Sequence, residues 1–397
     1  MEESDPRTVH PLDFTLGPLV EMIDLWDIAA IDQHAHNLLT PSAAARYPYP
    51  AAFTEGYDPD IVNHHARHSL FYRRSLREIA QLLECEPQEE AILERRTQLG
   101  LENLTRRCID ASKLEAIFLD DGFLPDEILP VEWHEQFVPV QRIIRLEYLA
   151  ENLITEVNDF GSFVERFRSE IDPPPAGVVA LKSIAAYRTG LAIQVTPQEA
   201  GERIFYTLKQ EAKDKPLRLT NKQFIDFLIS QALEIAAKHR LPVQFHTGFG
   251  DPDLDLRLSN PLYMRSLLEE RRFRNAPIVL LHASYPFIQQ AGYLASVYPQ
   301  VYLDFGLAVP FLSVAGMRST VQKLLELAPT SKLMYSSDAH NIPELYYLGA
   351  KWGREVLGQV LDEAVKDSDL TAKEAESVAT AILSENARAL YTQGARD

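Results

Sequence analysis

The chain has 397 residues, of which 46% are hydrophobic and 24% are charged. Its 39 Lys and Arg against 57 Asp and Glu give a formal net charge of -18. This composition is typical of a globular protein. The acidic balance, without a dense stripe of basic residues, argues against nucleic-acid binding, which needs several cations on one face.

The cysteines and the N-terminal residues indicate the cellular compartment of the protein. Cys85 and Cys108 could form at most one bridge, far fewer than disulfide-rich secreted domains use. Residues 1–5 are acidic, and no apolar run of signal-peptide or membrane-spanning length follows them. We therefore expect free thiols, no membrane association and a cytoplasmic location.

Short apolar runs rich in β-branched residues, bounded by Pro, Gly, Asp or Ser, predict buried parallel strands. They lie at residues 29–36, 114–120, 138–144, 177–183, 242–247, 277–284, 300–306 and 332–338. Helical patterns separate most of them, the clearest at 220–239 with Asn221 as an N-cap. Eight strand and helix units favour a (β/α)8 TIM-like barrel over an open doubly wound sheet. Periodicity alone does not distinguish a closed barrel from an open sheet.

Two long helical stretches extend this pattern. Residues 40–112 fall between the first two strands, and we expect a helical insertion at the barrel mouth. Residues 343–392 are also helical and are expected to pack on the outside. The prolines at 173–175 mark the loop before the fourth strand, because proline does not fit a helix interior or a central strand. Residues 1–397 as a whole are predicted to form a single barrel domain.

Polar residues interrupt the apolar runs near the carboxyl ends of the predicted strands. They are His34 and His36 on the first strand, Lys182 on the fourth, His246 on the fifth, His282 on the sixth and Asp338 on the eighth. In a barrel these strand ends converge on one mouth.

Imidazoles that converge with a carboxylate suit Zn²⁺, Mn²⁺ or Fe²⁺. His34 and His36 are two residues apart on a strand, so both side chains point to the same face. Taken singly, each histidine is better explained as a hydrogen-bonded core residue, and Asp338 as a cap of the helix that begins near Pro343. Their convergence favours a metal site, because packing alone would leave each buried polar group in need of its own partner.

The same segments resemble a known family. Asp-x-His-x-His at 32–36, with the runs at 244–248, 280–283 and 335–338, resembles the amidohydrolase superfamily, specifically its amidohydrolase-related (amidohydrolase 2) branch. Residues 181–191 are similar to the amidohydrolase-like domain that is fused to glutamine-synthetase-like domains in fungal and plant fluffy-gene G type proteins.

The resemblance implies a barrel that binds one or two divalent metals, with His34, His36, His246 and Asp338 as ligands. Zinc is the expected metal, with manganese or iron as alternatives. Asp338 would accept a proton from the attacking water. His282 would be a ligand of a second metal or, with one metal, a catalytic acid or base.

Lys182 leaves the number of metals open. In binuclear members of the family, a lysine on the fourth strand is carboxylated and bridges the two metals. The alternative is an ordinary ammonium group that contacts a substrate carboxylate. A carboxylated Lys182 would favour hydrolysis, because members of the branch that decarboxylate aromatic acids generally lack the bridging lysine.

Substrate contacts are expected just beyond the strand ends. Arg188 and Arg257 follow the fourth and fifth strands, where a guanidinium could hold a substrate carboxylate in a bidentate manner. Tyr187, beside Arg188, and His340, two residues after Asp338, are the other candidates. His340 is equally suited to capping the loop before Pro343.

The leading interpretation is a metal-dependent hydrolase that cleaves the C–N bond of an amide, or a γ-glutamyl-type amide, in a small polar substrate. One alternative is a mononuclear, non-oxidative decarboxylase of a small carboxylic acid. A second is a non-catalytic scaffold barrel, although every proposed ligand position is filled. The partner is expected to be a small molecule, and a homodimer stays open.

Overall fold

The computed structural model describes residues 23–392 and contains a single eight-stranded parallel sheet in that range, in the order β1-β2-β3-β4-β5-β6-β7-β9. The strands are β1 (Ala30–Ala35), β2 (Leu114–Asp120), β3 (Val140–Arg145), β4 (Val178–Ser183), β5 (Val243–Phe245), β6 (Ile278–Leu280), β7 (Val301–Asp304) and β9 (Leu333–Met334). A short strand, β8 (Gly306–Leu307), lies outside this order. Each strand of the sheet coincides with one predicted run.

Backbone hydrogen bonds join the last strand region to the first. The Gln33 amide donates to the Tyr335 carbonyl at 3.4 Å, and the Asp338 amide donates to the His34 carbonyl at 3.0 Å. The prediction of a (β/α)8 TIM-like barrel is therefore confirmed.

The later strands are shorter than their apolar runs because the chain leaves strand geometry before the polar residues. His282 has a φ of 66° and Asp338 a φ of 54°, both in the left-handed region. Such backbone is uncommon for residues other than glycine and clusters at functional sites. The turn places both side chains at the mouth of the barrel.

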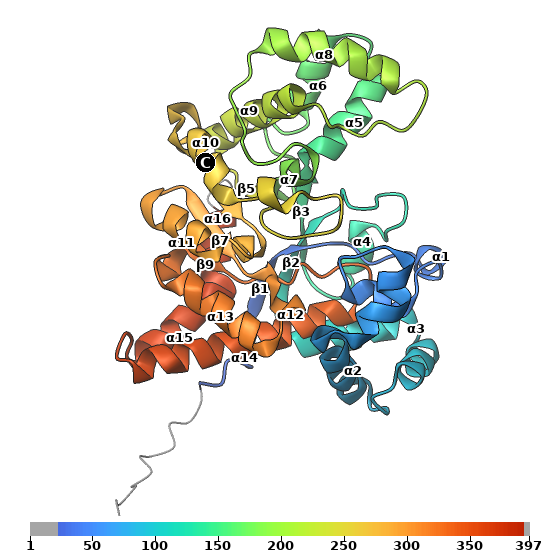
Figure 1. The fold of residues 1–397 in the computed structure, drawn as a ribbon, viewed down its shortest axis with the longest axis vertical. Coiled ribbons are helices and arrows are strands. Elements are labelled where there is room, and N and C mark those ends of the chain that lie inside the picture. The colour runs from blue at the N-terminus through green and yellow to red at the C-terminus, as the bar shows by residue number, and fades with distance from the viewer. Residues whose placement is uncertain (1–22, 393–397) are drawn as a thin grey trace, which may run out of the picture.

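Helices surround the sheet (Figure 1). They are α4 (Val131–His134), α5 (Leu146–Glu156), α6 (Phe160–Ser169), α7 (Ala185–Arg188), α8 (Gln198–Glu211), α9 (Lys222–His239), α10 (Arg265–Glu269), α11 (Ile288–Val297), α12 (Ala308–Phe311) and α13 (Val314–Leu325). The helix predicted at 220–239 is α9, and the Asn221 side chain accepts a hydrogen bond from the Phe224 amide at 3.1 Å, as expected of an N-cap. Because α9 leads directly into β5, this cap fixes the start of the unit that ends at His246.

The segment between β1 and β2 is mostly helical. It contains α1 (Pro41–Ala44), the short helical turns η1 (Tyr49–Phe53), η2 (Ile61–His65) and η3 (Ala66–His68), and the longer helices α2 (Leu70–Leu83) and α3 (Glu89–Ser112). Figure 1 shows this blue and cyan segment gathered at one side of the barrel, where α3 packs against the later helix α14 (Glu344–Lys366).

The C-terminal helices are α14, α15 (Ala372–Thr380) and α16 (Asn386–Tyr391). The last of them departs from the expectation of outside packing. Leu390 and Tyr391 of α16 belong to the same buried cluster as Ile31, Val279 and Met334 of the barrel strands. This apolar contact closes the barrel at the end opposite the mouth.

The described residues include no helix with both the length and the apolar run that a membrane crossing requires. The acidic start at residues 1–5 lies outside the described residues.

Candidate metal centre

Strand β1 brings His34 and His36 to the mouth of the barrel, and both side chains are buried. Asp32, on the same strand, accepts hydrogen bonds from the backbone amide of Ser337, at 2.9 Å, and from its hydroxyl group. These bonds tie β1 to the loop that carries Asp338. The two halves of the site, which lie 300 residues apart in the sequence, are thereby held in register.

Asp338 lies among the histidines. Its Oδ1 atom is 3.1 Å from His34 Nε2 and 3.4 Å from His36 Nε2, and its Oδ2 atom is 3.9 Å from His282 Nδ1. His282 Nε2 lies 3.0 Å from Nδ1 of His246. The four predicted histidines and the predicted aspartate therefore come together.

Lys182 adds a cation to this cluster. Its Nζ atom is 2.8 Å from His34 Nε2 and 3.3 Å from Asp120 Oδ2, and its side chain is buried. The Arg145 guanidinium also binds Asp120, with Nε 3.1 Å from both carboxylate oxygens and Nη2 2.5 Å from Oδ2. Burial alone would raise the pKa of Asp120, but the charges of Arg145 and Lys182 outweigh burial and lower it.

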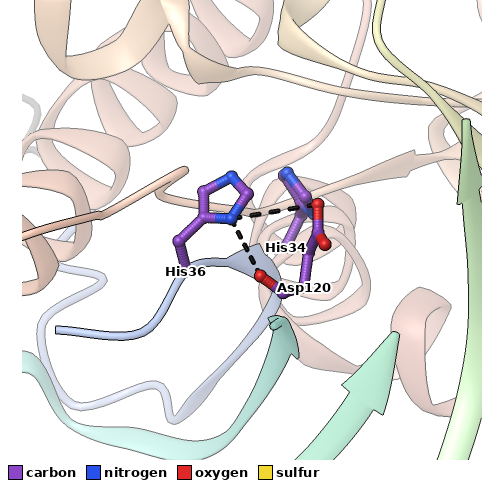
Figure 2. A group of neighbouring side chains, drawn as sticks. All are labelled: His34, His36 and Asp120. Atoms are coloured by element: carbon purple, nitrogen blue, oxygen red, sulfur yellow. Dashed lines mark hydrogen bonds and ion pairs between the residues drawn. The ribbon is translucent and has the colours of Figure 1, made fainter. Parts of the chain in front are cut away.

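Asp120 also orients His36. Figure 2 shows the His36 ring turned toward Asp120, with Nδ1 3.0 Å from the backbone carbonyl oxygen and 3.9 Å from Oδ2. A hydrogen bond from Nδ1 to that carbonyl leaves Nε2 free to act as a ligand, which is the usual support for a metal-binding histidine.

The protonation states of the side chains in this cluster favour cation binding. Burial lowers the pKa of His34 and His246 well below the usual value and that of His282 to about 4, so these rings are neutral. Burial opposes ionisation of Asp338, but the neighbouring histidines outweigh it and hold its pKa well below the usual range. Neutral imidazoles and ionised carboxylates are the forms that ligate metals.

Three buried polar atoms of the cluster have no hydrogen-bond partner within residues 23–392. They are His34 Nδ1, His282 Nδ1 and Asp338 Oδ1. Such orphaned groups are costly in a protein interior, and at least the carboxylate oxygen would be satisfied by a cation. Ligand atoms of His34, His282 and Asp338 lie within 4.8 Å of one another, as do those of His34, His36 and Asp120. The residues present therefore fit a divalent metal.

The cluster opens into a cavity of about 1040 Å³. Its inner wall contains His36, Lys182, His246 and Asp338, and its outer wall contains the predicted substrate contacts Tyr187, Arg188 and His340. The Tyr187 ring packs on His246, with ring centroids 4.4 Å apart. The sites that we expected to touch metal and substrate therefore face one space, which suits a small molecule.

Arg257 is not brought to this cavity. Its side chain is 88% exposed and pairs with Asp255 at 2.7 Å, within the same surface loop. The loop after β5 turns outward at this position, so a residue that follows closely in sequence lies away from the mouth. His282 lies behind His246 and does not line the cavity itself.

Three residues of the site were not predicted. Asp120 ends the second predicted strand and Arg145 directly follows the third, so the strand-end argument that found His246 could also have found them. Glu55 lines the cavity from the irregular chain after η1. No periodic signal in the sequence marks that position.

Comparisons with known proteins identify the same family that the sequence motifs resemble. The amidohydrolase family model matches residues 203–393, which include His246, His282 and Asp338. Protein fluG of Emericella nidulans is 32% identical over 414 aligned residues, which cover 95% of this chain and 47% of fluG. The predicted resemblance to the amidohydrolases is confirmed. The chain spans about half the length of this relative.

Solved structures share the fold of this chain. A candidate metal-dependent hydrolase from Lactobacillus casei is 29% identical with a TM-score of 0.82, and the match covers 94% of this chain and 98% of that one. A uronate isomerase from Thermotoga maritima is 14% identical with a TM-score of 0.63, over 92% and 95% of the two chains. At that identity the isomerase shows the shared fold alone.

Proposed function

We propose that this amidohydrolase relative is a metal-dependent hydrolase that cleaves the C–N bond of an amide, or a γ-glutamyl-type amide, in a small polar substrate. The observation that carries the proposal is the cluster of four buried histidines and Asp338, with its orphaned polar atoms, beside a cavity of about 1040 Å³. The similarity to the Lactobacillus casei hydrolase agrees with it.

The metal would be held by His34, His36, His246 and Asp338, with zinc expected and manganese or iron as alternatives. When bound, it would lower the pKa of a water molecule and polarise the scissile carbonyl group. His282 would join the ligands of a second ion, or act as an acid or base if one ion binds.

Asp338 is the proposed proton carrier. Its ionised carboxylate accepts the proton of the attacking water at Oδ1 or Oδ2 and delivers it to the departing amine. The amine leaves as the C–N bond breaks, and the acyl group leaves as a carboxylic acid.

Lys182 determines how many ions we expect. Its contacts with Asp120 and His34 are those of an ammonium group or an amine donor. Burial lowers the pKa of Lys182, so its reactive amine form is accessible, although Asp120 opposes this. A carboxylated Lys182 would bridge two ions, whereas an ammonium Lys182 would accompany a single ion.

Substrate recognition is assigned to Tyr187, Arg188 and His340 on the outer wall. Arg188 contacts Glu151 at 3.3 Å, while its buried Nε atom has no partner among the described residues. A substrate carboxylate in the cavity would share this guanidinium with Glu151.

Metal analysis combined with an amide assay tests the proposal. Protein purified without chelators should contain about one or two metal ions per chain and should release amine from a panel of amides that includes γ-glutamyl amides. The variant His34→Ala should lose both metal and activity while keeping its circular dichroism spectrum. Carbon dioxide release from carboxylic acids, with no amine from any amide, would identify a decarboxylase instead.

The scaffold alternative makes a different prediction. If the barrel acts only by association, cells that carry Asp338→Asn should retain its function, and purified protein should bind no metal.

The free thiols Cys85 and Cys108 fit the reducing cytoplasm that we propose as the location of the protein.

A further inference from the structure

Glu55 presents to the cavity a carboxyl group that has no hydrogen-bond or ion-pair partner among the described residues. It follows η1 in the segment between β1 and β2, is half-buried, and lines the same cavity as Asp338. Within residues 23–392, the charged groups that act on it are two carboxylates, Asp338 and Asp251, and no cation.

The other acidic residues of the outer cavity are already engaged. Glu151 pairs with Arg188 at 3.3 Å, and Asp253 pairs with Arg218 at 2.7 Å. Asp251 accepts a hydrogen bond from the Asp253 amide at 2.9 Å. No residue in the range 23–392 donates a hydrogen bond to the Glu55 carboxyl group, so a molecule bound in the cavity can supply the donor.

The chain around Glu55 is anchored across the cavity mouth. The hydroxyl group of Tyr57 donates to Asp253 Oδ1 at 2.8 Å, which joins this segment to the loop after β5. At Gly56, a Cβ atom would lie 2.7 Å from Ile61 Cγ2, so the chain packs tightly there. These contacts hold Glu55 at a defined place in the wall of the cavity.

The charge around Glu55 selects for a cation. Two further carboxylates act on it, and burial together with their charges raises the pKa of Glu55 to about 8. A positive group beside Glu55 would favour its ionised form, and the carboxylate would then accept a charge-assisted hydrogen bond. Arg188, on the outer wall of the same cavity, offers the opposite charge.

We propose that Glu55 binds the ammonium group of the substrate, and that the substrate class is a small molecule carrying both a primary ammonium group and a carboxylate, the latter held by Arg188. The inference rests on the proposed function, because it names the substrate class of the same cavity. Glu55 is thus a specificity-determining residue.

Binding calorimetry on the zinc-loaded full chain tests this assignment without any turnover. The probes are L-glutamate and glutarate, which differ by the ammonium group. Wild type should bind L-glutamate about tenfold more tightly, the scale expected of one charge-assisted hydrogen bond. Glu55→Gln should abolish the preference and leave glutarate affinity within about twofold. Glu55→Asp should retain part of the preference, since it keeps a carboxyl group.

Glu102→Gln, on the exposed face of α3, is the matched control and should bind both probes as wild type does. Equal affinity of wild type for the two probes, or no binding of L-glutamate, would overturn the assignment. So would a Glu55→Gln variant that weakens both probes equally. A retained preference with no amide hydrolysis would overturn the proposed reaction but keep the ammonium subsite.

Discussion

At the scale of single residues, buried charges are held in a chain of neighbours. Arg145 binds Asp120, Asp120 binds Lys182, and Lys182 contacts His34. Each charge is stabilised by the next, since an isolated buried charge would be far too costly. The position of Lys182 in the metal centre therefore depends on a residue that touches no proposed ligand.

Arg145→Ala should lower the free energy of unfolding by about 3 kcal/mol, because it leaves the buried carboxylate of Asp120 without its closest cation, with Lys182 and the Gly122 amide as the contacts that remain. Urea unfolding at neutral pH measures this change. Arg257→Ala removes an exposed, solvent-screened pair and should leave stability unchanged. Equal effects of the two variants would contradict the buried-network interpretation.

Glu55 should make stability depend on pH. Its pKa rises from 4.5 in a free side chain to about 8 in the fold, chiefly by burial. The folded state therefore holds a proton that the unfolded chain releases, and this contribution is complete below about pH 4.5 and lost as pH rises through about 8.

Between pH 5 and 9, the Glu55→Gln variant should consequently lose less stability than wild type. Urea unfolding of both proteins across this range, at constant metal occupancy, measures the difference. Parallel curves for wild type and Glu55→Gln would show that the carboxyl group is ionised in the fold at neutral pH.

At the scale of elements, the loop after β5 must approach α7 closely. A Cβ atom at Gly250 would lie 2.1 Å from the Tyr187 hydroxyl oxygen and 3.1 Å from His246 Nε2. This close approach presses the Tyr187 ring onto His246. The loop at Gly250 thus contacts both the Tyr187 ring and the proposed ligand His246.

Gly250→Ala should lower the free energy of unfolding by about 1–3 kcal/mol, the usual cost of overpacking, because the new methyl group collides with Tyr187. In a Tyr187→Ala background the same substitution should cost much less, since the colliding ring is gone. A double-mutant cycle by urea unfolding measures this coupling. Additive effects of the two changes would contradict the close contact.

At the scale of the whole molecule, the two ends of the barrel serve different purposes. The mouth gathers polar groups, whereas α16 fills the opposite end with Leu390 and Tyr391. The Tyr391 hydroxyl group donates to Gln33 Oε1 and accepts from Gln244 Nε2 at 2.9 Å. The C-terminal helix is therefore part of the barrel interior.

Tyr391→Phe should lower the free energy of unfolding by about 1–3 kcal/mol, because buried polar groups of Gln33 and Gln244 lose a partner. Chemical unfolding of the full chain measures this loss. Tyr206→Phe, at a side chain that is 48% exposed, is the matched control and should leave stability unchanged. An unchanged Tyr391→Phe variant would mean that the two glutamines satisfy each other.

The sequence by itself determined the eight strands, the Asn221 cap and the strand-end positions of His34, His36, Lys182, His246, His282 and Asp338. These features follow from local periodicity and from the rule that parallel strands end on one side, so no distance between remote segments was needed. The shared mouth of the barrel then brought the predicted histidines together.

Only the tertiary structure decided which loop residues reach the cavity. Arg257 follows β5 closely and still points to solvent, while Glu55, from an irregular segment, faces the site. The packing of α16 against the barrel strands could not be predicted from the sequence either, because its short apolar face resembles that of any helix that packs outside a barrel. Loop paths and helix docking depend on contacts between distant segments, and a sequence pattern reports only the residues near one another along the chain.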